Sequence, residues 1–193
     1  LYSQDNQIII KSLELTGNKS VSEKEILFII RQKPPNIIYR RPIFDARILK
    51  LDALSLKNYY HSKGFLDVNI DESFVIQGEN VEILYKIEEG KQYSISAVEI
   101  EGNSVISSDN IFSMLGIDVG EIYNPVKVNE SISLVENEYH ELGKLFFDME
   151  IKHEITDSIH LSIVIHEGKD IIIQRTHFEG IANIDTLLVQ REL

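Results

Sequence analysis

The sequence predicts an α+β protein made of two tandem modules, each a three-stranded mixed sheet with two helices on one face. Two observations lead to this prediction. Tyr60 and Gly64 recur as Tyr139 and Gly143, in both cases 79 positions later, which indicates an internal repeat. Within each repeat the hydrophobic patterns follow the order strand, helix, helix, strand, strand.

In the first repeat, residues 8–15 alternate as a strand does, and Gly17-Asn18 makes a turn. Either Ser20 or Ser22 can cap the helix that follows, with an acidic capping-box partner three residues later. This helix ends before Pro34-Pro35, and a loop then runs to Pro42.

A second helix is expected over residues 44–62. Its inward stripe consists of apolar residues at helical spacing, namely Leu49, Ala53, Leu56 and Tyr60. Gly64 ends the helix, because glycine adopts the left-handed conformation without a Cβ penalty. An alternating strand over 66–74, a hairpin turn at 77–80 and a return strand over 81–88 follow. Glu89-Gly90 closes the repeat.

The second repeat follows the same order. Gly102-Asn103 matches Gly17-Asn18, Ser107 caps a helix, and Asn124-Pro125 starts the next one. The inward stripe again has four members, each 79 positions after its counterpart: Val128, Ile132, Val135 and Tyr139. A strand marked by Phe147, Met149 and Ile151 leads to a return strand over 160–166, and Glu167-Gly168 closes the unit.

These patterns place one module at residues 7–90, a second at 91–168, and the start of a third, truncated module at 169–193. The linker at Gly90-Lys91-Gln92 is short. We therefore expect few contacts across it and relative motion between the modules.

Composition excludes several functional classes. The chain has 193 residues, of which 43% are hydrophobic, and it contains no cysteine, which rules out disulfides, thiolate metal sites and cysteine nucleophiles. The net charge of −12 opposes binding to phosphate backbones and anionic lipids, so we expect no nucleic acid partner. No apolar run reaches the roughly 20 residues of a membrane helix.

Tandem units in this order, each opening with hydrophobic-x-hydrophobic-x-Gly-Asn and closing with Glu-Gly, resemble POTRA domains, the soluble polypeptide-transport-associated modules of the Omp85 outer-membrane superfamily. The matching residues of the first unit are Leu13, Leu15, Gly17, Asn18, Tyr60, Gly64, Phe65, Glu89 and Gly90. Those of the second are Val98, Ile100, Gly102, Asn103, Tyr139, Gly143, Glu167 and Gly168. The second unit departs from the family after Gly143, where Phe146 or Phe147 is expected to fill an aromatic site.

The resemblance implies a periplasmic, non-enzymatic binding module without a cofactor, the soluble piece of a longer outer-membrane protein whose C-terminal β-barrel is not in this chain. The partners it implies are unfolded outer-membrane proteins, accessory lipoproteins of an assembly complex, and neighbouring POTRA modules.

An edge strand leaves backbone groups unpaired, so a partner strand can add to it. The expected edges are residues 66–74 and their repeat at 146–154. The side chains assigned to partner binding are Leu66, Val68, Ile70, Glu72, Phe74, Phe147, Met149 and Ile151. The alternative is that these edges only face solvent.

Other chemistry finds little support in the sequence. His61 and His140 are interpreted as exposed histidines at helix ends rather than pH sensors. Asp67-x-Asn69-x-Asp71 begins like a calcium loop, but it lacks the required glycine and the terminal glutamate. Arg40-Arg41 is interpreted as a solvated loop. No nucleophile, base and orienting residue occur together.

The main hypothesis is therefore the POTRA region of a BamA-like assembly factor for outer-membrane β-barrels. The alternatives are the POTRA region of a two-partner-secretion or translocation-assembly transporter, and a cell-division scaffold. An enzyme would need a bound cofactor or metal to be reconsidered.

Overall fold

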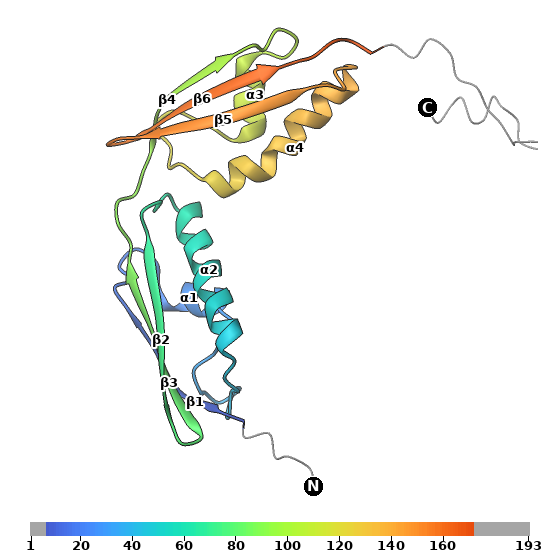
Figure 1. The fold of residues 1–193 in the computed structure, drawn as a ribbon. Helices are drawn as coiled ribbons and strands as arrows, with labels where there is room; N and C mark the ends of the chain where they lie inside the picture. The colour runs from blue at the N-terminus through green and yellow to red at the C-terminus, as the bar shows by residue number, and fades with distance from the viewer. Residues whose placement is uncertain (1–6, 172–193) are drawn as a thin grey trace, which may run out of the picture.

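The two sheets of the protein have the same construction. The computed structural model describes residues 7–171. The first module contains β1 (Ile9–Thr16), α1 (Glu23–Ile29), α2 (Ala46–Ser62), β2 (Asn69–Gln77) and β3 (Asn80–Glu88). The second contains β4 (Ile95–Glu101), α3 (Ser108–Leu115), α4 (Pro125–Glu141), β5 (Asp148–Ile155) and β6 (Ile159–His166). Figure 1 shows the modules end to end, each with its helices on one face of its sheet.

Each sheet is mixed. In the first, β3 lies in the centre, parallel to β1 and antiparallel to β2. In the second, β6 lies in the centre, parallel to β4 and antiparallel to β5. The predicted fold class is confirmed, and β2 and β5 are edge strands within the described chain.

The core of each module lies between the central strand and the long helix. Alternate residues of β3 are buried, and so is the whole predicted stripe of α2: Leu49, Ala53, Leu56 and Tyr60. In α4, Val128, Val135 and Tyr139 are buried and Ile132 packs at the margin. Full burial of one such aliphatic side chain contributes about 1.5–3 kcal/mol, so these stripes hold the helices on the sheets.

The helix starts also follow the sequence. Ser22, rather than Ser20, caps α1, and its side chain and backbone exchange hydrogen bonds with Glu25. Ser107 caps α3, and Asn124 caps α4 with Pro125 in the first turn.

Two strands begin later than expected. The first hairpin strand was expected from Leu66, but β2 begins at Asn69. The chain first makes a turn between Phe65 and Val68, in which Val68 N–H donates to the Phe65 carbonyl at 3.4 Å. Likewise β5 begins at Asp148. Phe147 precedes it and stacks on Tyr139, with ring centroids 4.3 Å apart, so Phe147 fills the aromatic site of the second module.

Most of the predicted third copy, residues 172–193, lies outside the described residues. None of the helices between residues 7 and 171 combines the length and apolar character required to cross a bilayer.

Candidate functional site

The closing glutamate of the first module binds the turn that opens it. The Glu89 carboxylate accepts hydrogen bonds from Lys19 N–H at 2.7 Å, Ser20 N–H at 2.8 Å and Ser20 Oγ at 2.7 Å. It also accepts one from the buried Tyr60 hydroxyl at 3.1 Å. Two motif residues, Tyr60 and Glu89, thus meet the turn that follows Gly17-Asn18 in one contact, which we call the turn clamp.

The second module repeats the turn clamp. The Glu167 carboxylate accepts hydrogen bonds from Ser104 N–H at 2.6 Å and Val105 N–H at 2.8 Å, and from the Tyr139 hydroxyl at 3.2 Å. The Glu-Gly signature therefore has a structural role in both modules.

The turn clamp holds both glutamates ionised. Burial alone raises the pKa of Glu89, but hydrogen bonds from Ser20 outweigh this effect and leave the pKa below its usual value. The same balance, with hydrogen bonds from Ser104 and Val105, lowers the pKa of Glu167 to about 2. Burial, with the nearby Glu167 charge, raises the pKa of Tyr139 to about 12, so the hydroxyl remains a donor.

The Gly-Asn pair shapes the clamped turn. Gly17 has a φ of 82°, and a Cβ there would lie 2.0 Å from the Ile87 carbonyl oxygen, so only glycine fits. Asn18 donates its side-chain amide to the Val21 carbonyl at 3.1 Å. Gly102 and Asn103 repeat both features.

The candidate binding residues fall into two groups. Ile70, Glu72 and Phe74 lie on β2, and Met149 and Ile151 lie on β5. The Phe74 ring packs against Phe44, with centroids 4.7 Å apart, and Ile70 packs against the first core. Met149 and Ile151 pack against the second core, so these apolar residues face the helix side of their sheets. Leu66, Val68 and Phe147 lie outside the strands, and Val68 is buried in the first core.

Two further residues of the β2 edge were not among the predicted binding residues. Val75 and Ile76 are 58% and 45% exposed, next to Phe74. A strand with one buried face alternates apolar and polar residues. Three apolar residues in succession therefore indicate that both faces of β2 are apolar near its C-terminal end. The succession Phe74-Val75-Ile76 was visible in the sequence.

Contacts cross the linker between the modules, so the expectation of few contacts there is wrong. Tyr93 N–H donates to the Gly64 carbonyl at 2.9 Å, and the Tyr93 hydroxyl donates to Asp67 at 2.6 Å. Leu66 packs against the core of the second module, and α2 contacts α4. Leu66 is thus a junction residue rather than an edge residue.

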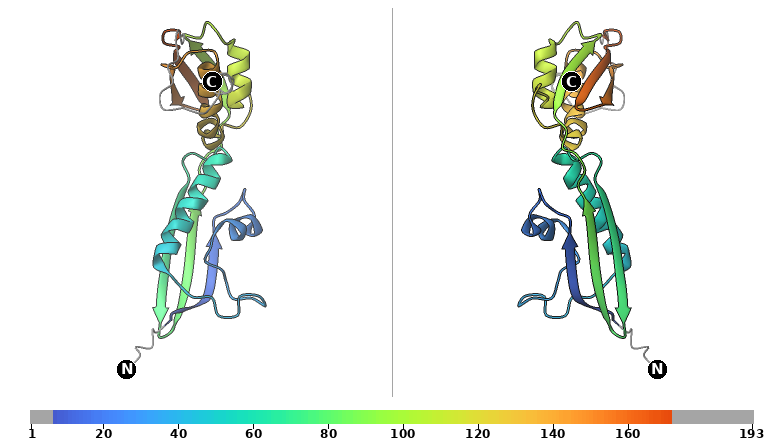
Figure 2. Two further views of the ribbon diagram at one scale, coloured as in Figure 1. Left: turned by 90° about the vertical axis from the view of Figure 1, so that its right-hand side faces the viewer. Right: turned by 90° about the vertical axis from the view of Figure 1, so that its left-hand side faces the viewer.

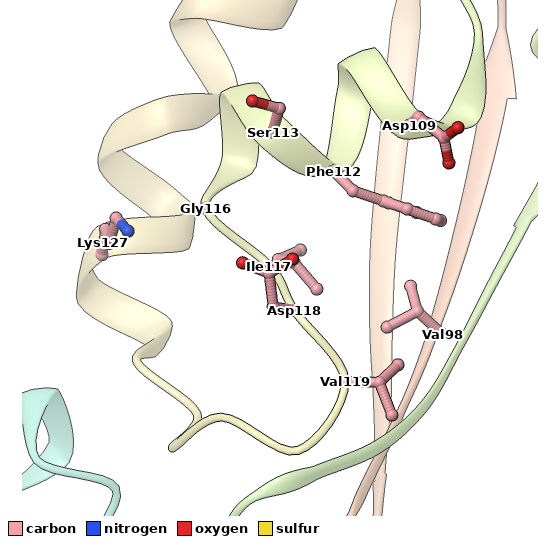
Figure 3. A pocket seen from close by; sticks show the side chains of 9 residues that line it. All are labelled: Val98, Asp109, Phe112, Ser113, Gly116, Ile117, Asp118, Val119 and Lys127. Carbon is pink, nitrogen blue, oxygen red and sulfur yellow. The ribbon is translucent and has the colours of Figure 1, made fainter.

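A hollow lies on the second module between α3, the start of α4 and β4 (Figure 3). Asp109 and Ser113 come from α3, and Lys127 of α4 lies against Gly116, the C-cap of α3. The lining holds no histidine beside its serine, so it offers no activated nucleophile of the usual kind. Within residues 7–171 no cluster of histidine, aspartate and glutamate could hold a metal ion.

The family model POTRA, described as surface antigen variable number repeat, matches residues 8–90 and 93–168. The chain is 25% identical to the outer membrane protein assembly factor BamA of Buchnera aphidicola, over 93% of this chain and 31% of the relative. It is 22% identical to the BamA of Neorickettsia risticii, over 96% of this chain and 26% of the relative. The chain thus spans less than a third of the length of these relatives.

Solved structures share the fold. The crystal structure of Haemophilus influenzae BamA POTRA3-5 matches with a TM-score of 0.62 and 18% identity, over 97% of this chain and 77% of that one. The N-terminal domain of Omp85 from Thermosynechococcus elongatus matches with a TM-score of 0.53 and 16% identity, over 97% and 76% of the two chains.

Proposed function

The chain belongs to the POTRA family, and from that premise we propose that it is the periplasmic POTRA array of an outer-membrane β-barrel assembly factor. In this role it acts without catalysis, and its partners are unfolded outer-membrane proteins, accessory lipoproteins, neighbouring POTRA modules and a C-terminal barrel. The names of the relatives support the assembly role.

The observation that carries the binding mode is the free edge of β2. This strand pairs only with β3 within the described chain, so the backbone groups on its other side are open to a partner strand. Strands of outer-membrane barrels alternate apolar and polar residues. An added strand of this kind would place its apolar face beside Phe74 and Ile76, on the helix side of the sheet.

Photo-cross-linking tests this binding mode. A photoreactive residue at Phe74 or Val75 should capture a ten-residue peptide with the alternating pattern of a barrel strand, while one at Leu54, on α2 and 56% exposed, serves as the control. The same peptide with a central proline should compete poorly, because proline cannot donate to the ladder. Capture at Leu54 alone, or equal competition by the proline peptide, would contradict strand addition.

A further inference from the structure

The segment between α1 and α2 ends in an exposed apolar tip. Ile37 and Ile38 are 90% and 82% exposed, and Tyr39 is 46% exposed. Figure 2 shows the segment projecting from the side of the first module, away from the sheet. Single exposed apolar residues are ordinary on protein surfaces, but three in succession on a projecting tip contribute nothing to the core.

Hydrogen bonds close the tip into a turn. The Asn36 side-chain oxygen accepts hydrogen bonds from Ile38 N–H at 2.8 Å and Tyr39 N–H at 2.7 Å. Asn36 N–H donates to the Tyr39 carbonyl at 2.9 Å. The two isoleucines are therefore already held at the end of the turn. This lowers the conformational entropy that the segment loses when it binds to another surface.

Both ends of the segment are fixed to the module. The carboxylate of the buried Asp52 accepts hydrogen bonds from Arg31 N–H and Gln32 N–H, both at 2.8 Å. At the other end, Ile10 N–H donates to the Pro42 carbonyl at 2.8 Å. The segment is thus an anchored arm.

The arm is locally cationic although the whole chain is acidic. Residues 26–44 contain Arg31, Lys33, Arg40 and Arg41 and no acid, in a chain of net charge −12. Lys33 donates to the Leu27 and Ile30 carbonyls at the end of α1. The two arginines at the tip, Arg40 and Arg41, form no ion pair among the described residues.

The negative charge of the rest of the chain does not cancel this local charge. Of the first two acids after the arm, Asp45 pairs with Arg47 at 2.9 Å and Asp52 is buried under the arm. Acids that lie more than about 8 Å away are screened at physiological ionic strength. An anionic surface that approaches the tip therefore meets two unpaired arginines first.

We propose that residues 36–41 form a membrane-contacting tip for an anionic lipid surface. Ile37 and Ile38 enter the boundary of the acyl region, Tyr39 lies at headgroup level, and Arg40 and Arg41 bind lipid phosphates. This inference goes beyond the proposed function and can be tested without assuming it.

The size and charge of the tip favour lipid over a protein partner. A stable protein interface buries about 800 Å² on each side, which one turn cannot supply, whereas a lipid surface demands no matching shape. A second copy of the chain would bring the same arginines face to face, because a symmetric dimer repeats one patch on both subunits. Like charges oppose that contact.

Tryptophan fluorescence tests the proposal, because the chain contains no tryptophan. In the Ile38→Trp variant the emission should shift to shorter wavelength with vesicles of phosphatidylglycerol and phosphatidylcholine in equal parts, but not with phosphatidylcholine alone. The Val119→Trp variant is the matched control, since Val119 is an exposed apolar residue of the second module, 64% accessible. It should show no shift with either vesicle.

Charge variants complete the test. One cation near an anionic membrane contributes about a factor of 5 to binding, so Arg40→Gln with Arg41→Gln should weaken partition of the Ile38→Trp protein by roughly twenty-five-fold. Lys50→Gln with Lys57→Gln changes the net charge equally at exposed positions of α2 and should change partition much less.

Three results would overturn the proposal. The first is no shift with anionic vesicles, which would leave the tip to a protein partner or to solvent. The second is equal binding by both charge variants. The third is a concentration-dependent shift without vesicles, which would indicate contact between two copies of the chain.

Discussion

The turn clamp makes Glu89 the most informative position for a test of stability. Its carboxylate accepts from two backbone amides and two hydroxyls, and the residue is only 9% exposed. In Glu89→Gln one oxygen can still accept from Lys19, Ser20 and Tyr60, but as a neutral acceptor. A hydrogen bond to a charged group contributes about 1 kcal/mol more than a neutral one, so we expect a loss of about 2–3 kcal/mol.

The complete removal of the acceptor should be worse. Glu89→Ala leaves the amides of Lys19 and Ser20 and the Tyr60 hydroxyl without a partner, and each unsatisfied buried group costs about 1–3 kcal/mol. We therefore expect a loss of about 4 kcal/mol or more. The order of stability should be parent, then Glu89→Gln, then Glu89→Ala.

Hydrogen exchange resolved by peptide mass spectrometry measures this effect module by module. Protection in β3 and α2 should fall, while protection in β6 and α4 should change little. Glu167→Gln is the internal control, because it should give the reverse pattern. A loss below about 0.5 kcal/mol for Glu89→Gln would refute the reasoning, since surface substitutions fall within that range, and so would an equal loss in both modules.

Three further predictions follow from the same contacts. Gly17→Ala should destabilise the first module by about 3 kcal/mol or more in a urea titration, because the new side chain would have a positive φ and would overlap a carbonyl oxygen. Gly78→Ala is the control: Gly78 also has a positive φ but open space around it, so this change should cost only about 1–2 kcal/mol. Glu167 has a folded pKa of about 2 against the usual 4.5, so its stabilising effect is complete above pH 4.5 and lost as the pH falls towards 2. That shift alone corresponds to about 3 kcal/mol, which solvent screening of this partly exposed group reduces to about 1–2 kcal/mol. Glu167→Gln should remove this part of the acid sensitivity when urea titrations at about pH 6, above the window, and about pH 2.5, near its lower end, are compared. Leu66→Ser should leave both modules folded but broaden the distances measured between spin labels on α1 and β5, and an unchanged distribution would show that Leu66 does not couple the modules.

Sequence periodicity predicted the parts of the fold that depend on burial along one element. The stripe from Leu49 to Tyr60 and the alternation in β3 are both local patterns, because a helix and a strand each turn their side chains with a fixed period. The cap Asn124 was equally visible, and the first cap was narrowed to Ser20 or Ser22, since a cap binds a backbone amide within its own first turn. These local signals were enough to establish the order of elements and the repeat.

Contacts between distant residues were not predictable in this way. Glu89 and Ser20 are 69 positions apart, and nothing in the sequence around Glu89 indicates that its carboxylate binds a turn. Asp52 is similar: it is a charged residue on an amphipathic helix, yet it is 1% exposed and accepts hydrogen bonds from the amides of Arg31 and Gln32. A buried acid needs partners, but the partners come from another element.

Leu66 is a residue whose position the alternating pattern predicted wrongly, and comparison of the two repeats shows why. By alternation Leu66 belongs to a strand, but it packs against the neighbouring module, while its counterpart 79 positions later, Leu145, is 53% exposed. The hydrogen bond beside it is nevertheless repeated, because Tyr93 N–H donates to the Gly64 carbonyl at 2.9 Å and Ile171 N–H donates to the Gly143 carbonyl at 3.0 Å. The same glycine carbonyl therefore receives the outgoing chain in both modules, so this hydrogen bond belongs to the repeat unit rather than to one linker. The equal spacing of Tyr60 and Tyr139 thus also fixes the position of this glycine in each module.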